Sequence, residues 1–264
     1  MSRPVSVRVL AVAAALAVCA CAGARAKRSE TYGARKGLAQ ELVRRDDWSR
    51  AFALVDALYR EDPKDPEVLA LRGVIYREQK LFKEAEADLA EALSLAPDNA
   101  YAHSNLALVF DREGRGSEAL EHHRRAAALD KRNAGYVNNL AFSLFAHGKP
   151  REAIPVFHEA LRIDPTNPRI RNNLGFAYAG TGDFRHAAEQ FSMGGGRAEA
   201  NNNLGYAYQV ASNFAQAFDL YVEALRLQPG LARARQNLQE VARRLGRPIP
   251  TDLPPEPRPP TEGT

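Results

Sequence analysis

Side-chain amides recur along this chain at nearly fixed spacing. Asparagine pairs begin at residues 138, 172 and 202, so intervals of 34 and 30 residues separate them. Each carboxamide offers donors and an acceptor, which suits pairing with the backbone of an extended peptide. Asparagine is only a middling helix former, so helix propensity does not explain its recurrence. The amide positions are Asn105, Asn138, Asn139, Asn172, Asn173, Asn202, Asn203 and, near the C-terminus, Asn237.

Residue types that serve in catalysis or metal binding are scattered. His122 and His123 are adjacent, so on a helix they point to different faces, and His158 has no second histidine at metalloprotease spacing. Both cysteines precede residue 22, which leaves the rest of the chain without a thiol for zinc. The glycines at 194–196 follow a helical pattern and not a strand, so they lack the setting of a nucleotide-binding loop. We expect no enzyme activity, no metal, no cofactor and no small-molecule substrate.

The charge pattern argues against nucleic acid as a partner. The chain has 36 lysines and arginines against 32 acidic residues, a formal net charge of +4. Acids and bases are interleaved, and no block of basic residues forms a stripe that could follow a phosphate backbone. A protein partner is the remaining expectation.

The N-terminus has the features of an export signal. Arg3 and Arg8 precede an unbroken apolar run, Val9 to Val18. This run is too short to span a bilayer but has the length of a signal-peptide core. Both cysteines, Cys19 and Cys21, follow this run directly.

The stretch Val18-Cys19-Ala20-Cys21 resembles the lipobox of bacterial lipoproteins, although a cysteine at the middle position departs from that pattern. The resemblance implies a signal peptide over 1–20, lipidation of Cys21, and a tether over 21–31. Because Ala22 and not an aspartate follows, it further implies an outer-membrane lipoprotein facing the periplasm. A plain secreted or periplasmic form cleaved within 22–26 and an uncleaved anchor are the alternatives.

The asparagine pairs belong to a longer repeated phrase. The sequence Asn-Asn-Leu-Gly-Phe-Ala-Tyr at 172–178 returns as Asn-Asn-Leu-Gly-Tyr-Ala-Tyr at 202–208. In the regular unit 66–99, Gly73, Tyr76, Ala85, Ala92 and Pro97 stand at positions 8, 11, 20, 27 and 32. This spacing resembles the tetratricopeptide repeat, a helix-turn-helix unit of about 34 residues. Small residues at positions 8, 20 and 27 let two antiparallel helices approach, and the proline ends the second helix.

The resemblance implies an all-α, right-handed solenoid of about six tetratricopeptide repeats with a C-terminal capping helix. Such arrays need a cap to cover the last apolar face. From residue 246 onward, seven of nineteen residues are proline, so we predict a disordered tail over 246–264. The predicted repeats are 32–65, 66–99, 100–133, 134–167, a shortened 168–197, and 198–231, followed by the cap helix at 232–245.

In tetratricopeptide proteins, positions 2, 5, 6, 9, 12 and 13 face a concave groove. This resemblance implies that the amides stand beside an aromatic strip at position 9. The predicted partner-binding residues are Asn105, Asn138, Asn139, Asn172, Asn173, Asn202, Asn203, Phe142, Phe176 and Tyr206. The alternative is that the position-6 amides bond to neighbouring helices and serve the fold.

The glycines at 194–196 stand where the second helix of the shortened repeat should continue. They predict a helix end with a tight turn, in which glycine accepts a positive φ. The alternative is a hinge between a four-repeat block and a two-repeat block.

With the lipobox added, the chain resembles the repeat lipoproteins that serve pilus and secretion machines. The TadD lipoproteins of Tad (Flp) pilus assembly are nearest, and the type IV pilotins of the PilF kind come next. The resemblance implies a non-enzymatic, membrane-anchored scaffold that binds a secretin or a pilus component. The alternative is an adaptor for peptidoglycan-modifying enzymes or another envelope complex.

Overall fold

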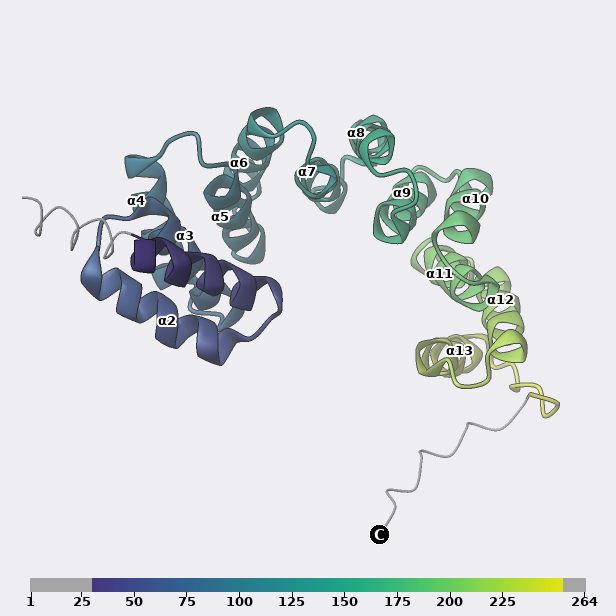
Figure 1. Ribbon diagram of the computed structural model, residues 1–264. Helices are drawn as coiled ribbons and strands as arrows, with labels where there is room; N and C mark the ends of the chain where they lie inside the picture. The colour runs from purple at the N-terminus through teal and green to yellow at the C-terminus, as the bar shows by residue number, and fades with distance from the viewer. Residues whose placement is uncertain (1–29, 254–264) are drawn as a thin grey trace, which may run out of the picture. The chain divides into compact units, whose positions relative to one another are not determined.

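The computed structural model describes residues 30–253, and within that range it consists of α-helices joined by short turns, with no β-strand (Figure 1). This confirms the predicted all-α solenoid of helix-turn-helix repeats. A helix occupies residues 30–44, so Glu30 and Thr31 are helical and not part of a tether as predicted. The helices that follow are α2 (Trp48–Glu61), α3 (Pro66–Glu78), α4 (Phe82–Leu95), α5 (Ala100–Arg112), α6 (Gly116–Leu129), α7 (Ala134–Ala146), α8 (Pro150–Ile163), α9 (Pro168–Gly180), α10 (Phe184–Gly194), α11 (Arg197–Val210), α12 (Phe214–Leu227) and α13 (Ala232–Leu245).

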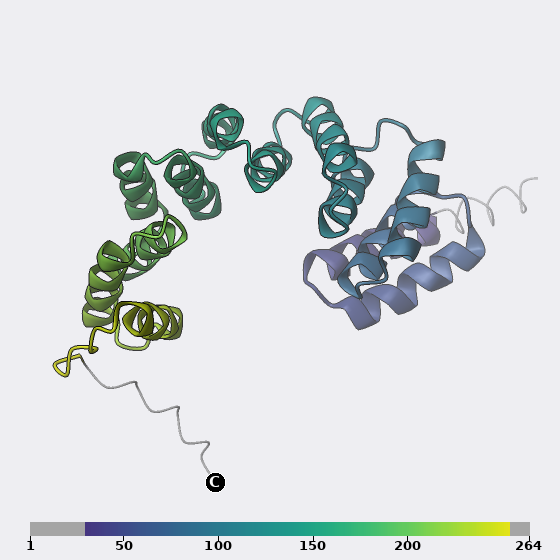
Figure 2. The same ribbon diagram turned by 180° about the vertical axis from the view of Figure 1, so that it is seen from behind.

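The chain divides into two compact units, one ending at Glu113 and the other beginning at Gly114. In the first unit α3 packs on α4, and α5 packs beside both. In the second unit the pairs α7–α8, α9–α10 and α11–α12 follow one another, and Figure 2 shows the same pairs from behind. The boundary between the units therefore does not coincide with the glycines at 194–196.

The first helix of most repeats begins after a capping side chain. Asp65 accepts hydrogen bonds from the backbone N–H groups of Glu67 and Val68, and an asparagine does the same for three later helices. These caps satisfy donors that a helix start leaves unpaired. The capping asparagines are Asn99, Asn133 and Asn167.

Glycine at position 8 lets the two helices of a repeat cross closely, as the spacing predicted. A Cβ added at Gly175 would lie 2.6 Å from Cε1 of Phe191, and one at Gly205 would lie 2.9 Å from Cε1 of Tyr221. Both rings are fully buried. The backbone of each first helix therefore rests directly on an aromatic ring of its partner helix.

The core follows the helix pairs in separate clusters. In the first unit Val55, Leu58 and Ile75 are fully buried, and in the second Phe157 and Leu174 are fully buried. Each such side chain contributes about 1.5–3 kcal/mol by leaving water. Because every repeat contacts mainly its neighbours, stability is spread along the array.

The shortened repeat differs from the expectation at the glycines. Helix α10 ends at Gly194, and Gly195 is extended (φ −175°) while Gly196 has φ −68°, so no positive φ occurs here. Lack of space explains why residue 194 is a glycine, because a Cβ added there would lie 2.8 Å from Oδ1 of Asn172. The turn is also shorter than in other repeats and lacks a capping side chain for α11.

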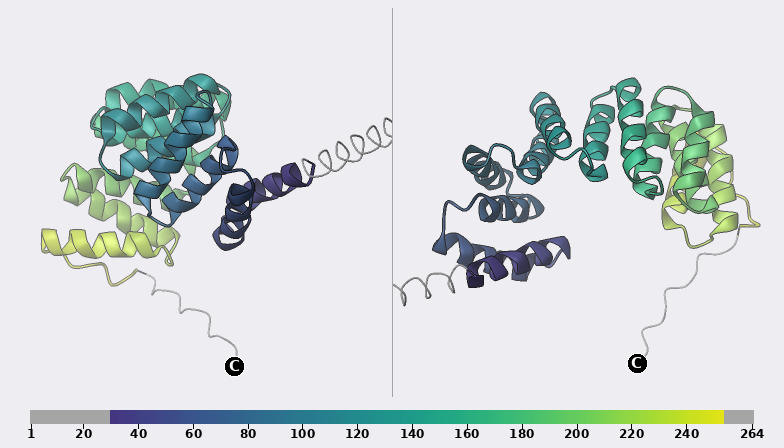
Figure 3. Two further views of the ribbon diagram at one scale, coloured as in Figure 1. Left: turned by 90° about the vertical axis from the view of Figure 1, so that its left-hand side faces the viewer. Right: turned by 45° about the horizontal axis from the view of Figure 1, so that its top comes forward.

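Residues 246–253 differ from the prediction of a disordered tail. Helix α13 ends at Leu245 and is capped by Gly246, whose φ of 61° is left-handed. Arg247 then pairs with Asp219 of α12 at 2.9 Å, and its guanidinium lies 3.9 Å from the ring centre of Phe218. Leu253 packs against the last core cluster. Asp252 of the same segment pairs with Arg226 at 3.1 Å. One apolar side chain and two ion pairs thus hold this segment, which follows α13 in Figure 3.

Several predictions concern residues outside the described range. These are the signal peptide over 1–20, lipidation at Cys21, the tether up to residue 29, and the tail from 254 to 264. Within residues 30–253, no helix is both long and apolar enough to cross a membrane.

Candidate functional site

The asparagines form an amide ladder between the first helices of successive repeats. Asn173 donates from Nδ2 to Oδ1 of Asn138 at 3.0 Å. Two further rungs are longer and therefore weaker, one from Asn203 to Asn172 at 3.4 Å and one from Asn237 to Asn202 at 3.5 Å. In each rung, position 6 of one repeat donates to position 5 of the repeat before it.

Three of the predicted partner-binding asparagines are buried. Asn105, Asn138 and Asn202 expose only 6%, 3% and 9% of their surface. Asn105 accepts a hydrogen bond from Arg77 and donates to the carbonyl of Tyr101 at 2.7 Å. The structure therefore corrects the prediction for these three residues, because their amides hold helices together and do not face solvent. Helix rotation places position 5 between helices in the later repeats.

The other predicted amides are half-buried at the helix surfaces. Asn172 donates to the carbonyl of Gly194 at 3.4 Å as well as accepting from Asn203. Asn139 and Asn173 keep part of their side chains in solvent. A contact between these amides and a partner stays a prediction.

A hollow lined almost entirely by apolar groups lies in the second unit. We call it the apolar groove, and it encloses about 460 Å³. Its residues come from the last turns of α7, α9 and α11 and from the residue after α11. They are Phe145, Phe176, Ala179, Gly180, Tyr206, Ala207, Val210 and Ala211.

Aromatic contacts fix the walls of the apolar groove. Phe176 stands edge-on to the buried Phe191 at 4.8 Å between ring centres, and Tyr206 stands edge-on to Phe176 at 6.1 Å. Phe142 neighbours Phe145 at 6.4 Å and is 47% exposed, as is Tyr206. The three predicted aromatic residues thus lie in or beside one groove, and packing orders their rings before any ligand arrives.

Sequence reasoning missed the floor of the groove and its most exposed residue. Ala179, Gly180, Ala207 and Ala211 bring no bulk, so they leave room between the aromatic walls. Val210 is 69% exposed, a high value for a valine. Val210 and Gly180 stand at position 13 of their repeats. Position 13 is one of the positions expected to face the groove, so both residues could have been predicted from the repeat frame.

The apolar groove carries no charge. The Tyr206 hydroxyl is the one polar side-chain group among its lining residues. Beyond it, on α13, Arg243 and Arg244 both pair with Glu240, and the Arg244 guanidinium lies 5.2 Å from the ring centre of Phe214. The end of α13 therefore carries two arginines for one carboxylate.

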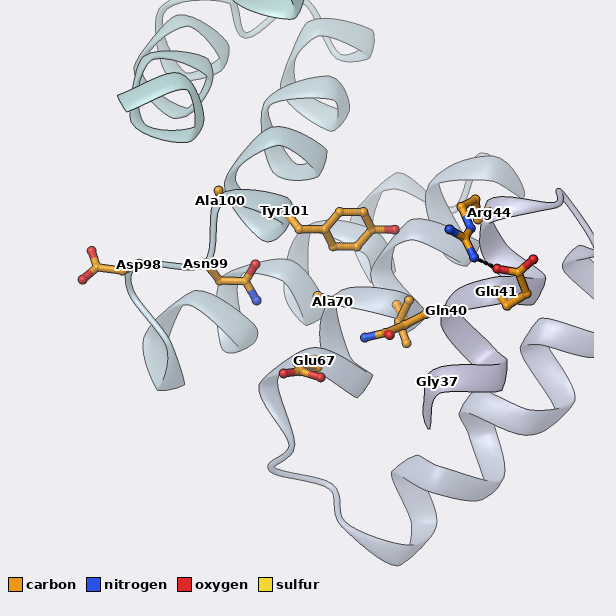
Figure 4. Close-up of a pocket in the computed structure, with 11 residues that line it drawn as sticks. Gly37, Gln40, Glu41, Arg44, Glu67, Ala70, Asp98, Asn99, Ala100 and Tyr101 are labelled. Carbon is orange, nitrogen blue, oxygen red and sulfur yellow. Dashed lines mark ion pairs between the residues drawn. The ribbon is translucent and has the colours of Figure 1, made fainter. Parts of the chain in front are cut away.

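The first unit has a second pocket of about 770 Å³ between the helix at 30–44, α3 and α5. Figure 4 shows Tyr101 extending from α5 toward the side of the first helix that carries Gln40 and Arg44. Its charges are paired, since Glu41 binds Arg44 and Lys36 lies 3.0 Å from Glu67. These residues are not among the predicted site residues. Paired charges offer less to a ligand than the uncovered apolar surface of the second unit.

Titratable groups elsewhere in the second unit serve packing. His158 bonds to the Tyr178 hydroxyl at 2.9 Å, and the Tyr178 ring stacks on His186 at 5.1 Å. Burial raises the pKa of Tyr178. Hydrogen bonds from the backbone and side chain of His186 lower the pKa of Asp183. Across residues 30–253, no three His, Cys, Asp or Glu side chains gather as a metal ligand set would.

Family models described as the tetratricopeptide repeat match the chain over residues 36–99, 102–135 and 144–207. No curated protein matches it in sequence.

Solved structures with similar folds include Pseudomonas aeruginosa pilF, which is 20% identical with a TM-score of 0.63, over 81% of this chain and 99% of that one. YrrB, described as a tetratricopeptide-repeat protein with an unusual peptide-binding site, is 21% identical with a TM-score of 0.54, over 70% of this chain and 97% of its own. MamA is 20% identical with a TM-score of 0.51, over 66% and 96%. At these identities the likeness shows the fold.

Proposed function

Because the chain is a tetratricopeptide-repeat protein, we propose that it is a non-enzymatic scaffold whose apolar groove holds a segment of a partner protein. The observation that carries this proposal is the gathering of Phe142, Tyr206 and Val210, all strongly exposed, at one groove. A contiguous apolar surface of this kind marks an interaction site in soluble proteins. The peptide-binding site named for YrrB supports the same reading of the fold.

We further propose that the scaffold is anchored at the outer membrane through Cys21 and assists pilus or secretion-system assembly. The lipobox-like stretch supports the anchor, and the fold similarity to pilF supports the machinery. The partner would be a secretin or a pilus component. A role as adaptor for peptidoglycan-modifying enzymes is the alternative.

A site-specific crosslinker tests the groove. Photoreactive benzoylphenylalanine replaces Tyr206 in the full chain, and the control places it at Leu227, which is similarly exposed (46%) but lies outside the groove. We expect adducts with a secretin or pilus protein from position 206 alone. Adducts with a peptidoglycan hydrolase would favour the alternative partner. Equal adducts from both positions, or none from 206, would contradict the groove assignment.

Fractionation tests the anchor separately. The wild-type chain should sediment with outer membranes, and Cys21→Ala should appear in the soluble periplasmic fraction. A Cys21→Ala protein that still sediments with outer membranes would rule out lipidation as the anchor and would leave the groove assignment untouched.

A further inference from the structure

The apolar groove offers almost nothing for a peptide backbone to bond with. Its lining has one polar side chain, the hydroxyl of Tyr206. An extended segment buried there would lose water from its N–H and C=O groups without gaining partners, at about 1–3 kcal/mol for each unpaired group. A bound segment must therefore satisfy its own backbone.

Two of the amides that could have paired with an extended backbone already use one N–H in the ladder. Nδ2 of Asn173 binds Asn138, and Nδ2 of Asn203 binds Asn172. A strand-like ligand would be left with the second N–H of each Nδ2, and neither amide belongs to the lining of the groove. A helix closes its backbone hydrogen bonds internally and meets a groove through side chains alone.

The shape of the groove selects bulky side chains. Small residues form its floor, with Gly180 and Ala207 between the walls made by Phe145, Phe176 and Tyr206. Leucine or aromatic side chains spaced at i, i+3 or i+4, and i+7 line one face of a helix. Such a face would fill the volume that the floor leaves open.

Charge selects the polar face of the ligand. Residues 114–253 contain 18 lysines and arginines and 13 acidic residues, a difference of +5. On α13, which contacts α11, Arg243 and Arg244 share the single carboxylate of Glu240. Lys149, whose Nζ lies 3.9 Å from Glu152, precedes the Pro150 ring that contacts the Gly180 edge of the groove. Acidic residues flanking an apolar face would meet these cations.

We propose that the apolar groove binds an amphipathic helix of a partner protein, with bulky apolar residues on one face and acidic residues beside them. This inference rests on the proposed function, because it names the class of segment that the groove holds. The apolar lining, the small residues between its aromatic walls and the positive net charge of residues 114–253 support it together.

Synthetic peptides test the proposal by fluorescence anisotropy with the full chain. The probe is an acidic amphipathic helix of about 16 residues with leucines at i, i+4 and i+7, long enough for about four turns. One control replaces its glutamates with lysines. A second control keeps the leucines but carries two central prolines, which prevent a helix.

The protein variants are matched. Val210→Glu places a carboxylate in the groove, and Leu227→Glu places one on an exposed apolar residue outside it. We expect the acidic helix to bind, Val210→Glu to weaken it by about tenfold or more, and Leu227→Glu to leave it within about twofold. The lysine peptide should bind more weakly, and the proline peptide should lose binding. Circular dichroism confirms that both variants remain folded.

The possible results separate the claims. If the proline peptide binds as well as the helix and still depends on Val210, the groove takes extended segments and the helix proposal falls while the proposed function stands. If the lysine peptide binds better, the acidic assignment falls. If the Val210→Glu variant binds the peptide as tightly as the wild type, the groove is not the binding site and both proposals fall.

Discussion

Asn173 donates a hydrogen bond of 3.0 Å to Asn138, and this bond joins α9 to α7 across two successive repeats. Asn138 is 3% exposed and Asn173 is half-buried. The same donor and acceptor positions recur in the next two repeats. The ladder therefore fixes the alignment of successive helices, because a helix shifted along its axis would leave a buried amide without a hydrogen bond.

Removing either partner of this rung should lower stability without affecting the groove. We expect Asn138→Ala and Asn173→Ala each to cost about 0.5–1.5 kcal/mol in urea unfolding. The double variant should cost less than the sum, with a coupling of at least about 0.5 kcal/mol. Binding of the acidic helical peptide should be unchanged. Additive losses would mean that the rung is not formed, and lost peptide binding in stable variants would return these amides to the binding site.

The close crossing at Gly205 predicts an unusual cost for a single methyl group. A Cβ there would lie 2.9 Å from the Tyr221 ring, which is buried and whose hydroxyl binds Gln209 at 2.7 Å. Because the ring is held at both ends, we expect Gly205→Ala to destabilise by about 1–3 kcal/mol. Thermal unfolding followed by circular dichroism measures the change.

The control is Gly37→Ala, in the helix at 30–44. An added Cβ at Gly37 meets nothing within 4 Å, so this change should stabilise the helix by about 0.5–1 kcal/mol. If the two substitutions shift stability in the same direction, close helix approach at Gly205 is not the reason for its glycine.

The sequence predicted the fold well because small and aromatic residues recur in frame. Gly205 and Tyr221 stand at positions whose roles in helix crossing follow from their size. The role of Asn138 could not be predicted in this way, because its neighbour Asn139 has the same chemistry. Adjacent residues of a helix point in different directions, so a small rotation of the helix decides which of the two asparagines faces the neighbouring helix.

Two other features could not be predicted from the sequence, for physical reasons. The glycines at 194–196 were expected to supply a positive φ, but residue 194 must be small because the amide of Asn172 packs against it from another helix. The segment at 246–253 has the composition of a solvated tail, yet Arg247 and Leu253 find partners on the core that no local pattern reveals.

A buried ion pair in the first unit should behave differently from the amide ladder. Arg72 binds Asp88 through two hydrogen bonds of 2.5 and 2.6 Å, and its guanidinium lies 3.4 Å from the ring centre of Tyr59. Burial opposes the charge on Arg72, but the bonds to Asp88 outweigh it and raise its pKa. The side chains of Arg72 and Asp88 are only 12% and 9% exposed.

Breaking this pair should cost more than replacing it. Arg72→Met leaves a buried carboxylate, so we expect a loss of about 3–5 kcal/mol in urea unfolding. The double variant Arg72→Met with Asp88→Leu should recover most of that loss, because neither charge then remains buried. A double variant as unstable as the single one would show that the pair contributes through packing of Arg72 on Tyr59 and not through charge.

Asp65 links a helix cap to the pH dependence of the first unit. Its Oδ1 caps α3 through the N–H of Glu67 at 2.9 Å, and its Oδ2 accepts from Lys36 at 3.1 Å. Burial disfavours the carboxylate, but the bonds from Lys36 and the backbone outweigh it, so the pKa of Asp65 lies below its ordinary value of 3.8. The stability it contributes is therefore present above about pH 4 and is lost as the pH falls through the lowered pKa.

Two substitutions separate the cap from the charge. Asp65→Ala removes both and should cost about 1–2 kcal/mol at pH 7. Asp65→Asn keeps a cap that Asn99 and Asn133 already provide elsewhere, so it should cost less than about 1 kcal/mol. Denaturant unfolding of the wild type at pH 7 and at pH 3 should show a loss at low pH that Asp65→Asn reduces. An identical pH dependence in the wild type and Asp65→Asn would show that the carboxylate of Asp65 has the same pKa in the folded and unfolded chain.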